Sequence, residues 1–313
     1  MTETPTIRIV TFANLPAYYD VKPVKVTADE AFWRRLLGTN WDRIPGLNVW
    51  RAHKIMAMVM HHADELYRGK LPEGVTFFGS YRDYDTRGWI QDPKCNRGLV
   101  TLLAQHLAKR DGAMVDVGTN LGILTSLVAN ALPGREHLCI EANPHTARIA
   151  ARTLYANRIE KAKLVVCAVG DTEGVVELHF TPFHSGNAGL GITASKVPDR
   201  IVKTPMITLD KLLASLTESK VAVIKIDVEG FEPEVIMGAM ETIRAQRPVL
   251  VLEFNDSAKG RSLSYSSVFA QLRDIGYSLS WLLDSTDVSS LQPEAAGQRP
   301  SGGCDVVCVP RDR

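Results

Sequence analysis

The 313-residue chain lacks a strong charge of either sign, long apolar runs and internal repeats. Its net charge is +1, so it lacks the basic stripe of a nucleic-acid-binding or membrane-surface protein. No apolar run approaches the roughly 18 residues that a membrane span needs. The first residues have neither the basic nor the apolar region of a signal peptide. We therefore expect a soluble, cytoplasmic protein with no nucleic-acid and no membrane partner.

Cysteine is scarce, and its spacing argues against disulfide or zinc chemistry. The five cysteines are odd in number and include no C-x-x-C pair. Cys139 and Cys167 lie in apolar runs, which is typical of small core residues. Cys304 and Cys308 are four residues apart, but no further ligands lie nearby to complete a zinc site. We expect reduced thiols.

From about residue 96 onward, strand-like and helix-like segments alternate, which is typical of a parallel α/β sheet. Apolar residues make up 45% of the chain, enough for a sizeable core. The pattern predicts a Rossmann-like α/β domain over 96–313, with a mostly parallel seven-stranded sheet, helices on both faces and an antiparallel hairpin at the end. The strands are expected at 113–118, 137–142, 163–169, 222–228, 248–254, 278–283 and 305–309.

Residues 1–95 differ in character and are rich in Trp and Tyr. A helical stretch near 51–68 carries a Met stripe. We expect a mainly helical N-terminal cap that contributes to substrate binding. A second irregular region follows an expected edge strand at 174–181. Its Gly- and Ser-containing stretch, 182–195, is long for a compact domain and is interpreted as an active-site lid.

The most informative motif is DVGTNLG at 116–122, directly after a strand and before a helix. Gly118 and Gly122 allow the backbone to approach a ligand closely, and the helix N-terminus offers N–H donors to an anion. That anion would be the carboxylate of a methionine moiety, and Asp116 would face its ammonium group. A dinucleotide fingerprint needs a glycine where this chain has Asn120, which argues against nicotinamide or flavin binding.

Two acidic residues follow later strands of the same sheet. Glu141 ends the second strand, where an acid pairs with ribose hydroxyls. Asp171 follows the third strand, where it reaches an adenine edge or caps the turn; both readings remain open.

The motif KIDVEGFE at 225–232 places several carboxylates at the end of a strand predicted to be buried. Such charges are unfavourable unless they are paired or used. We interpret Asp227 and Glu229 as functional, whereas Glu232 also suits the start of the next helix through the helix dipole.

Taken together, these blocks resemble the FkbM family of S-adenosylmethionine-dependent methyltransferases over about residues 96–256. The blocks are DVGTNLG, IEANP, AVGDTEGVVELHF, ITLDKLL, IKIDVEGFEPEVIMGAMETI and RPVLVLEF. The resemblance implies methyl transfer, most often to a hydroxyl of a polyketide, sugar or other secondary metabolite; N-methylation of an amine or peptide-derived product is the alternative. It assigns the cofactor site to Asp116, Gly118, Thr119, Asn120, Gly122, Glu141, Ala142, Asp171 and Asp227.

Methyl transfer to a hydroxyl also requires removal of a proton, and Asp227, Glu229 and His184 are the candidate general bases. A divalent metal is not favoured; if one binds, Asp227, Glu253 and Asn255 are its expected ligands. The expected partner is a small-molecule acceptor, and the sequence leaves open whether the protein is a homo-oligomer.

Overall fold

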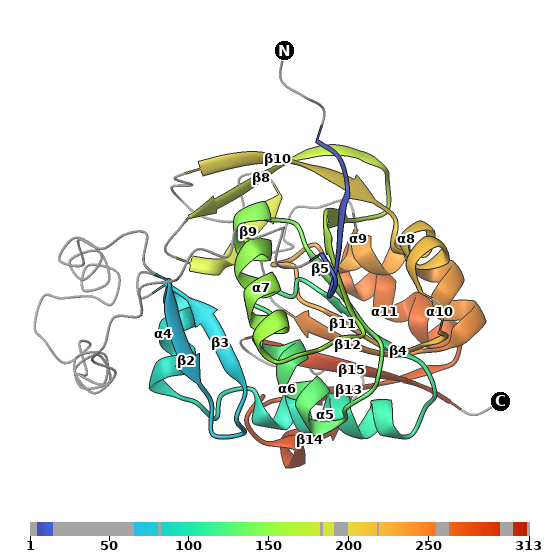
Figure 1. The fold of residues 1–313 in the computed structure, drawn as a ribbon. Helices are drawn as coiled ribbons and strands as arrows, with labels where there is room; N and C mark the ends of the chain where they lie inside the picture. Colours follow the sequence, from blue (N-terminus) through green and yellow to red (C-terminus); the bar gives the residue numbers. More distant parts are fainter. Residues whose placement is uncertain are drawn as a thin grey trace, which may run out of the picture.

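A computed structural model gives the fold (Figure 1). The structure describes residues 5–14, 66–80, 83–181, 184–190, 200–217, 219–254, 263–294 and 303–311.

The domain is built on a nine-stranded sheet with the order β1-β6-β5-β4-β11-β12-β15-β13-β14. The strands are β1 (Arg8–Thr11), β4 (Ala113–Val117), β5 (His137–Glu141), β6 (Ala162–Val166), β11 (Val221–Ile226), β12 (Val249–Phe254), β13 (Tyr277–Leu282), β14 (Leu291–Pro293) and β15 (Cys304–Pro310). The five strands from β6 to β12 are parallel, and β15 is antiparallel between β12 and β13. The predicted mostly parallel, Rossmann-like α/β fold is confirmed. The sheet differs in having two more strands, β1 and β14, at its edges.

Helices cover both faces of this sheet (Figure 1). They are α5 (Arg97–Ala108), α6 (Ile123–Ala131), α7 (Pro144–Ala156), α8 (Leu209–Leu216), α9 (Glu232–Met237), α10 (Met240–Gln246) and α11 (Tyr265–Asp274). Successive side chains of β4 enter different cores, as the pleat of a strand requires. Val115 and Val117 pack with α8 to α11, whereas Met114 packs with α5 and α6. The burial of both faces explains the continuous apolar runs of these strands.

The predicted strand 163–169 is divided between two sheets. β6 ends at Val166, and β7 (Ala168–Val169) pairs instead with β10 (Arg200–Ile207). The second sheet has the order β7-β10-β8-β9 and includes β8 (Gly174–Thr181) and β9 (His184–Leu190). β8 is the edge-like strand expected from alternation. Within the interval interpreted as a lid, 184–190 form β9, while 182–183 and 191–195 lie outside the described residues.

The predicted helix 233–245 is also divided, into α9 and α10. A Cβ atom added to Gly238, between them, would lie 2.0 Å from the carbonyl oxygen of Gly170. The close approach of these two backbones therefore requires glycine. Asp210 accepts hydrogen bonds from the backbone N–H groups of Glu241 and Thr242, and so stabilises the first turn of α10.

The described part of residues 1–95 is not mainly helical. It contains β1, the hairpin of β2 (Tyr67–Lys70) and β3 (Thr76–Gly79), and the helix α4 (Tyr84–Gln91). The end of the helix predicted near 51–68 falls in β2, whose residues are alternately buried and exposed, as a strand with period two requires. Residues 51–65 lie outside the described residues. β1 pairs with β6, so this region contributes to the main sheet. The domain boundary after residue 95 stays a prediction.

Two further expectations concern the whole chain. All five cysteines are free, and Cys139 and Cys167 are buried, as predicted. Among the helices that the structure describes, none has the length and apolar character that a membrane span requires.

Candidate functional site

A cavity of about 700 Å³ lies at the carboxyl ends of the parallel strands. Such ends are where ligands bind in open α/β sheets. Four segments that carry predicted site residues contribute to its wall: Val117–Leu121 after β4, Glu141–Ala142 after β5, Asp227–Glu229 after β11, and Glu253 in β12. Further parts of the wall come from α4, the start of α5 and of α6, Cys167–Val169, β8, β9 and the segments around the last strands of the sheet.

The loop after β4 has the backbone that its two glycines predict. Gly118 has a φ of +81°, and a Cβ atom there would lie 1.8 Å from the carbonyl oxygen of Asp227. Gly122, with a φ of +73°, is the N-cap of α6 and has no side chain to satisfy the first N–H groups of that helix. The loop therefore approaches β11 closely and leaves the helix N-terminus available to an anionic group.

Glu141 ends β5 and lies in the cavity wall beside Ala142. Its carboxylate accepts hydrogen bonds from the backbone N–H groups of Asn120, at 3.0 Å, and Asn143, at 2.9 Å. Burial raises the pKa of Glu141 to about 7, although both hydrogen bonds oppose this shift. Glu141 thus joins the loop after β4 to the loop after β5. A carboxylate can accept further hydrogen bonds, so the residue can also bind hydroxyl groups of a ligand.

Asp116 is buried beneath this loop rather than in the cavity wall, at 1% exposure. It accepts hydrogen bonds from the hydroxyl groups of Thr119, at 2.9 Å, and Thr125, at 2.5 Å. Its other oxygen lies 3.8 Å from the ammonium group of Lys225. The structure therefore gives Asp116 contacts that hold the loop and the start of α6.

Lys225 is a site residue that the sequence interpretation missed. Its ammonium group is buried, lies in the cavity wall and donates a 2.9 Å hydrogen bond to Asp227. It therefore joins the acidic strand end to Asp116. A lysine at the next-to-last position of an apolar strand, followed two residues later by a carboxylate on the same face, was the available signal.

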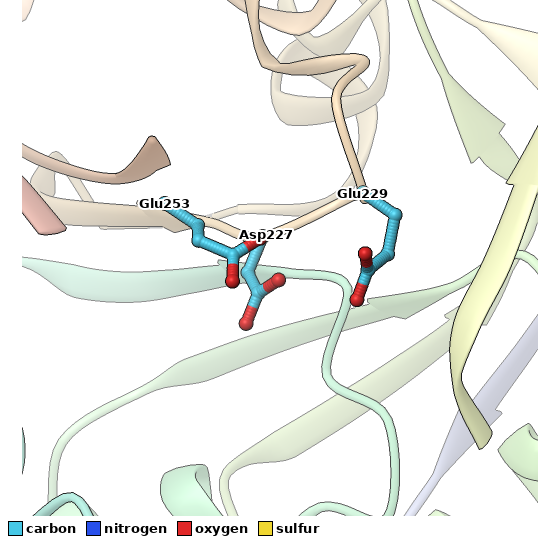
Figure 2. A group of neighbouring side chains, drawn as sticks. All are labelled: Asp227, Glu229 and Glu253. Atoms are coloured by element: carbon cyan, nitrogen blue, oxygen red, sulfur yellow. The ribbon is translucent and has the colours of Figure 1, made fainter. Parts of the chain in front are cut away.

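Three carboxylates converge beside the cofactor loop, as Figure 2 shows: Asp227 and Glu229 from the loop after β11, and Glu253 from β12. One oxygen of each lies within 4.8 Å of the others. Burial and the charge of Asp227 raise the pKa of Glu229 to about 8. The charge of Asp227, followed by burial, raises the pKa of Glu253.

This set includes two of the three residues that the sequence proposed for a metal. The third, Asn255, lies outside the described residues. Three oxygen donors fit a hard divalent cation, and the expectation that no metal is needed stays a prediction.

The loop that carries Glu229 is held from below by Glu232, which is fully buried. Glu232 accepts hydrogen bonds from the backbone N–H groups of Val228, at 2.9 Å, and Gly230, at 3.2 Å, and from the hydroxyl of Tyr265. Glu229 itself has a φ of +56°. Such a conformation is unfavourable for a residue with a Cβ and persists only when its surroundings impose it. Glu232 therefore does more than begin α9: it fixes the direction of Glu229.

Four of the predicted site residues lie outside the cavity wall: Asp116, Gly122, Asp171 and His184. Asp171 is exposed, and the neighbouring wall is formed by Cys167, Ala168 and Val169. His184 lies beside the wall residue Asp85, with its Nε2 atom 3.6 Å from a carboxylate oxygen of that residue. The remaining predicted residues, Gly118, Thr119, Asn120, Glu141, Ala142, Asp227 and Glu229, do lie in the wall.

Comparison with known proteins gives one family and a set of remote structural neighbours. The family model described as "Methyltransferase FkbM domain" matches residues 116–279, more than half of the chain. No curated protein matches.

The solved structures are remote in sequence. An FkbM methyltransferase from Methylobacillus flagellatus aligns at 16% identity and a TM-score of 0.42, over 63% of this chain and 43% of that one. An O-methyltransferase from Bacillus cereus in complex with SAH aligns at 12% identity and a TM-score of 0.39, over 70% of this chain and 81% of that one. An O-methyltransferase from Streptomyces achromogenes, involved in tomaymycin synthesis and in complex with SAM, aligns at 14% identity and a TM-score of 0.38. The alignment covers 68% of this chain and 79% of that one. The resemblance seen in the sequence blocks is confirmed by the family match, and the chain belongs to the FkbM methyltransferase domain family.

Proposed function

We propose that the protein is an S-adenosylmethionine-dependent methyltransferase that acts on a hydroxyl oxygen of a small natural product or sugar. The observation that carries this proposal is the meeting of three elements around one cavity. They are the glycine loop at Val117–Leu121, the acid Glu141, and the carboxylates Asp227 and Glu229. The family match supports methyl transfer as the reaction.

The residues present fit S-adenosylmethionine. The cavity of about 700 Å³ is within the roughly 300–1,000 Å³ of small-molecule sites. Asn120 lies in its wall, and its side-chain oxygen is buried with no hydrogen-bond partner among the described residues. A ligand donor would satisfy it. The start of α6 suits the carboxylate of the methionine moiety, Glu141 the ribose hydroxyls, and Ala142 with Val169 the apolar faces of adenine.

When bound, S-adenosylmethionine supplies an activated methyl group on a sulfonium. The chain's own task is then to orient the acceptor and to take its proton. Glu229 is the favoured base, because Asp227 is already bound to Lys225 at 2.9 Å, whereas Glu229 is directed into the cavity beside it. Its pKa of about 8 suits proton transfer near neutral pH.

An amine is the second candidate acceptor, and the charge of the cavity wall favours it. Among the described residues, Lys225 is the one Lys or Arg in the wall. Seven carboxylates share the wall: Asp85, Glu141, Asp227, Glu229, Glu253, Asp284 and Asp305. The carboxyls among them that are ionised attract a protonated amine.

Methyl transfer from radiolabelled S-adenosylmethionine to matched hydroxyl and amine acceptors, with and without EDTA, tests these assignments. We expect labelled ether products, no effect of EDTA, and a large loss of kcat in Glu229→Gln. The control is Glu241→Gln, because Glu241 is exposed on α10 and lies outside the wall. Exclusive labelling of amines would overturn the choice of oxygen. An unchanged kcat in Glu229→Gln would exclude Glu229 as the base.

A further inference from the structure

The start of α4 contacts the start of β9, about a hundred residues later in the chain. Asp85, in the first turn of α4, accepts hydrogen bonds from the backbone N–H of Gly186, at 2.5 Å, and from the hydroxyl of Ser185, at 3.0 Å. Asp83, the N-cap of α4, accepts one from the backbone N–H of Ser185, at 2.6 Å. Two carboxylates thus bind two successive N–H groups of one strand.

The local sequence is suited to this contact on both sides. A Cβ atom at Gly186 would lie 2.9 Å from a carboxylate oxygen of Asp85, so a larger residue there would displace that carboxylate. Asp83 also accepts hydrogen bonds from the N–H and hydroxyl of Thr86, at 2.8 and 2.7 Å, and so fixes the first turn of α4. Hydrogen bonds to ionised carboxylates are the stronger kind.

Both partners of this contact form the cavity wall. Asp85 and Trp89 contribute from α4, and Ser185, Gly186, Ala188 and Gly189 contribute from β9. The contact lies on the side of Glu229, because the charges of both His184 and Asp85 act on the Glu229 carboxyl. That is the acceptor side of the proposed site, whereas Glu141 marks the cofactor side.

We propose that Asp85 is a positioning residue that holds β9 against α4 and so forms the acceptor-side wall of the cavity. The assignment of this wall to the acceptor rests on the proposed function. The contact between Asp85 and β9 is independent of it.

The charges around Asp85 support an ionised carboxylate. Burial opposes ionisation of Asp85, but the hydrogen bond and charge of His184, with the donors of Gly186 and Ser185, lower its pKa overall. Burial and the nearby charge of Asp85 raise the pKa of Asp83. Arg87, on the same helix, interacts with both carboxylates, and Glu229 faces Asp85 from the loop after β11.

His184 lies beside this contact. Its Nε2 atom faces Asp85 at 3.6 Å, and its ring packs on Tyr84 with the centroids 4.8 Å apart. Burial lowers the pKa of His184, but the carboxylates of Asp85, Asp83 and Glu229 outweigh it and raise the pKa.

Amide hydrogen exchange over 184–190 tests the contact without any acceptor. In Asp85→Ala the amide of Gly186 should exchange roughly ten- to a hundredfold faster, because a hydrogen bond to a charged group is lost. Asp85→Asn keeps an acceptor oxygen and should show a smaller increase. Asp92→Ala is the matched control: it removes the same charge from the other end of α4, where Asp92 is exposed and outside the wall. Unchanged exchange in Asp85→Ala, or an equal increase in Asp92→Ala, would overturn the proposal.

Kinetics test the role of the contact. In Asp85→Asn the KM for the acceptor should rise about tenfold, while kcat and the KM for S-adenosylmethionine change less than about twofold. A general loss of fold would instead change all three, and an unchanged acceptor KM would remove Asp85 from the acceptor wall. Failure of the wild type to bind S-adenosylhomocysteine would overturn the proposed function instead, and the exchange result would still decide the contact.

Discussion

Lys225→Met removes the ammonium group that lies between the buried Asp116 and the half-buried Asp227. Its Nζ atom is 2.9 Å from Asp227 and 3.8 Å from Asp116, and the Lys225 side chain is only 6% exposed. Asp227 is 37% exposed, so solvent screens part of its charge. Loss of Lys225 leaves Asp116, which is 1% exposed, with an uncompensated buried charge, at a cost of about 3–5 kcal/mol. We expect a loss of this size in the free energy of unfolding, measured by urea titration at pH 7.

The matched control is Lys211→Met. Lys211 lies 2.8 Å from Glu173, a similar distance, but these side chains are 60% and 51% exposed. Solvent screens such a pair, so the loss should be about 0–1 kcal/mol. The double variant Lys225→Met/Asp227→Asn should be more stable than Lys225→Met alone, since it removes one of the uncompensated charges. Equal losses in the two lysine variants, or no recovery in the double variant, would refute the argument from burial.

Three further outcomes follow from groups of the site and of the sheet that carries it. Glu229→Gln should lower kcat by roughly 10²–10⁴-fold. The wild-type rate should rise with pH through about 8, because only ionised Glu229 accepts a proton. A rate that stays flat across pH 7–9 would contradict this assignment. Burial lowers the pKa of His137 from 6.5 to about 4. As pH falls from 6.5 to 4, the unfolded chain therefore binds a proton at His137 that the folded chain does not. The free energy of unfolding should fall by about 3 kcal/mol over this range. Urea titrations of His137→Leu should not show this loss. Tyr265→Phe leaves buried Glu232 without one donor and should lower the free energy of unfolding by about 1–3 kcal/mol; an unchanged urea midpoint would mean that this hydrogen bond contributes nothing.

The sequence was sufficient for the central sheet and the cofactor loop because their signals are local. Apolar strands buried on both faces and a glycine loop before a helix appear within a few neighbouring residues. Gly118 illustrates this, since its positive φ and its close approach to Asp227 both follow from the motif that contains it. Glu141, at the end of the next strand, could be placed for the same reason.

The contacts that sequence reasoning missed are long-range or depend on which sheet a strand joins. Nothing near Asp85 indicates that its partners are Ser185 and Gly186, about a hundred residues away. The strand before Asp171 leaves the main sheet at Cys167. As a result, Cys167–Val169 line the cavity and Asp171 is exposed to solvent. Neither change of direction produces a local pattern.

Calorimetric titration with S-adenosylhomocysteine, beside NAD, tests the central claim most directly. We predict that the wild type binds S-adenosylhomocysteine with a dissociation constant in the micromolar range and does not bind NAD. Binding should be about tenfold weaker in Glu141→Gln, because the group that accepts hydrogen bonds from the ribose loses its charge. Absence of binding by well-folded wild-type protein, or binding of NAD in its place, would contradict the assignment of this cavity to S-adenosylmethionine.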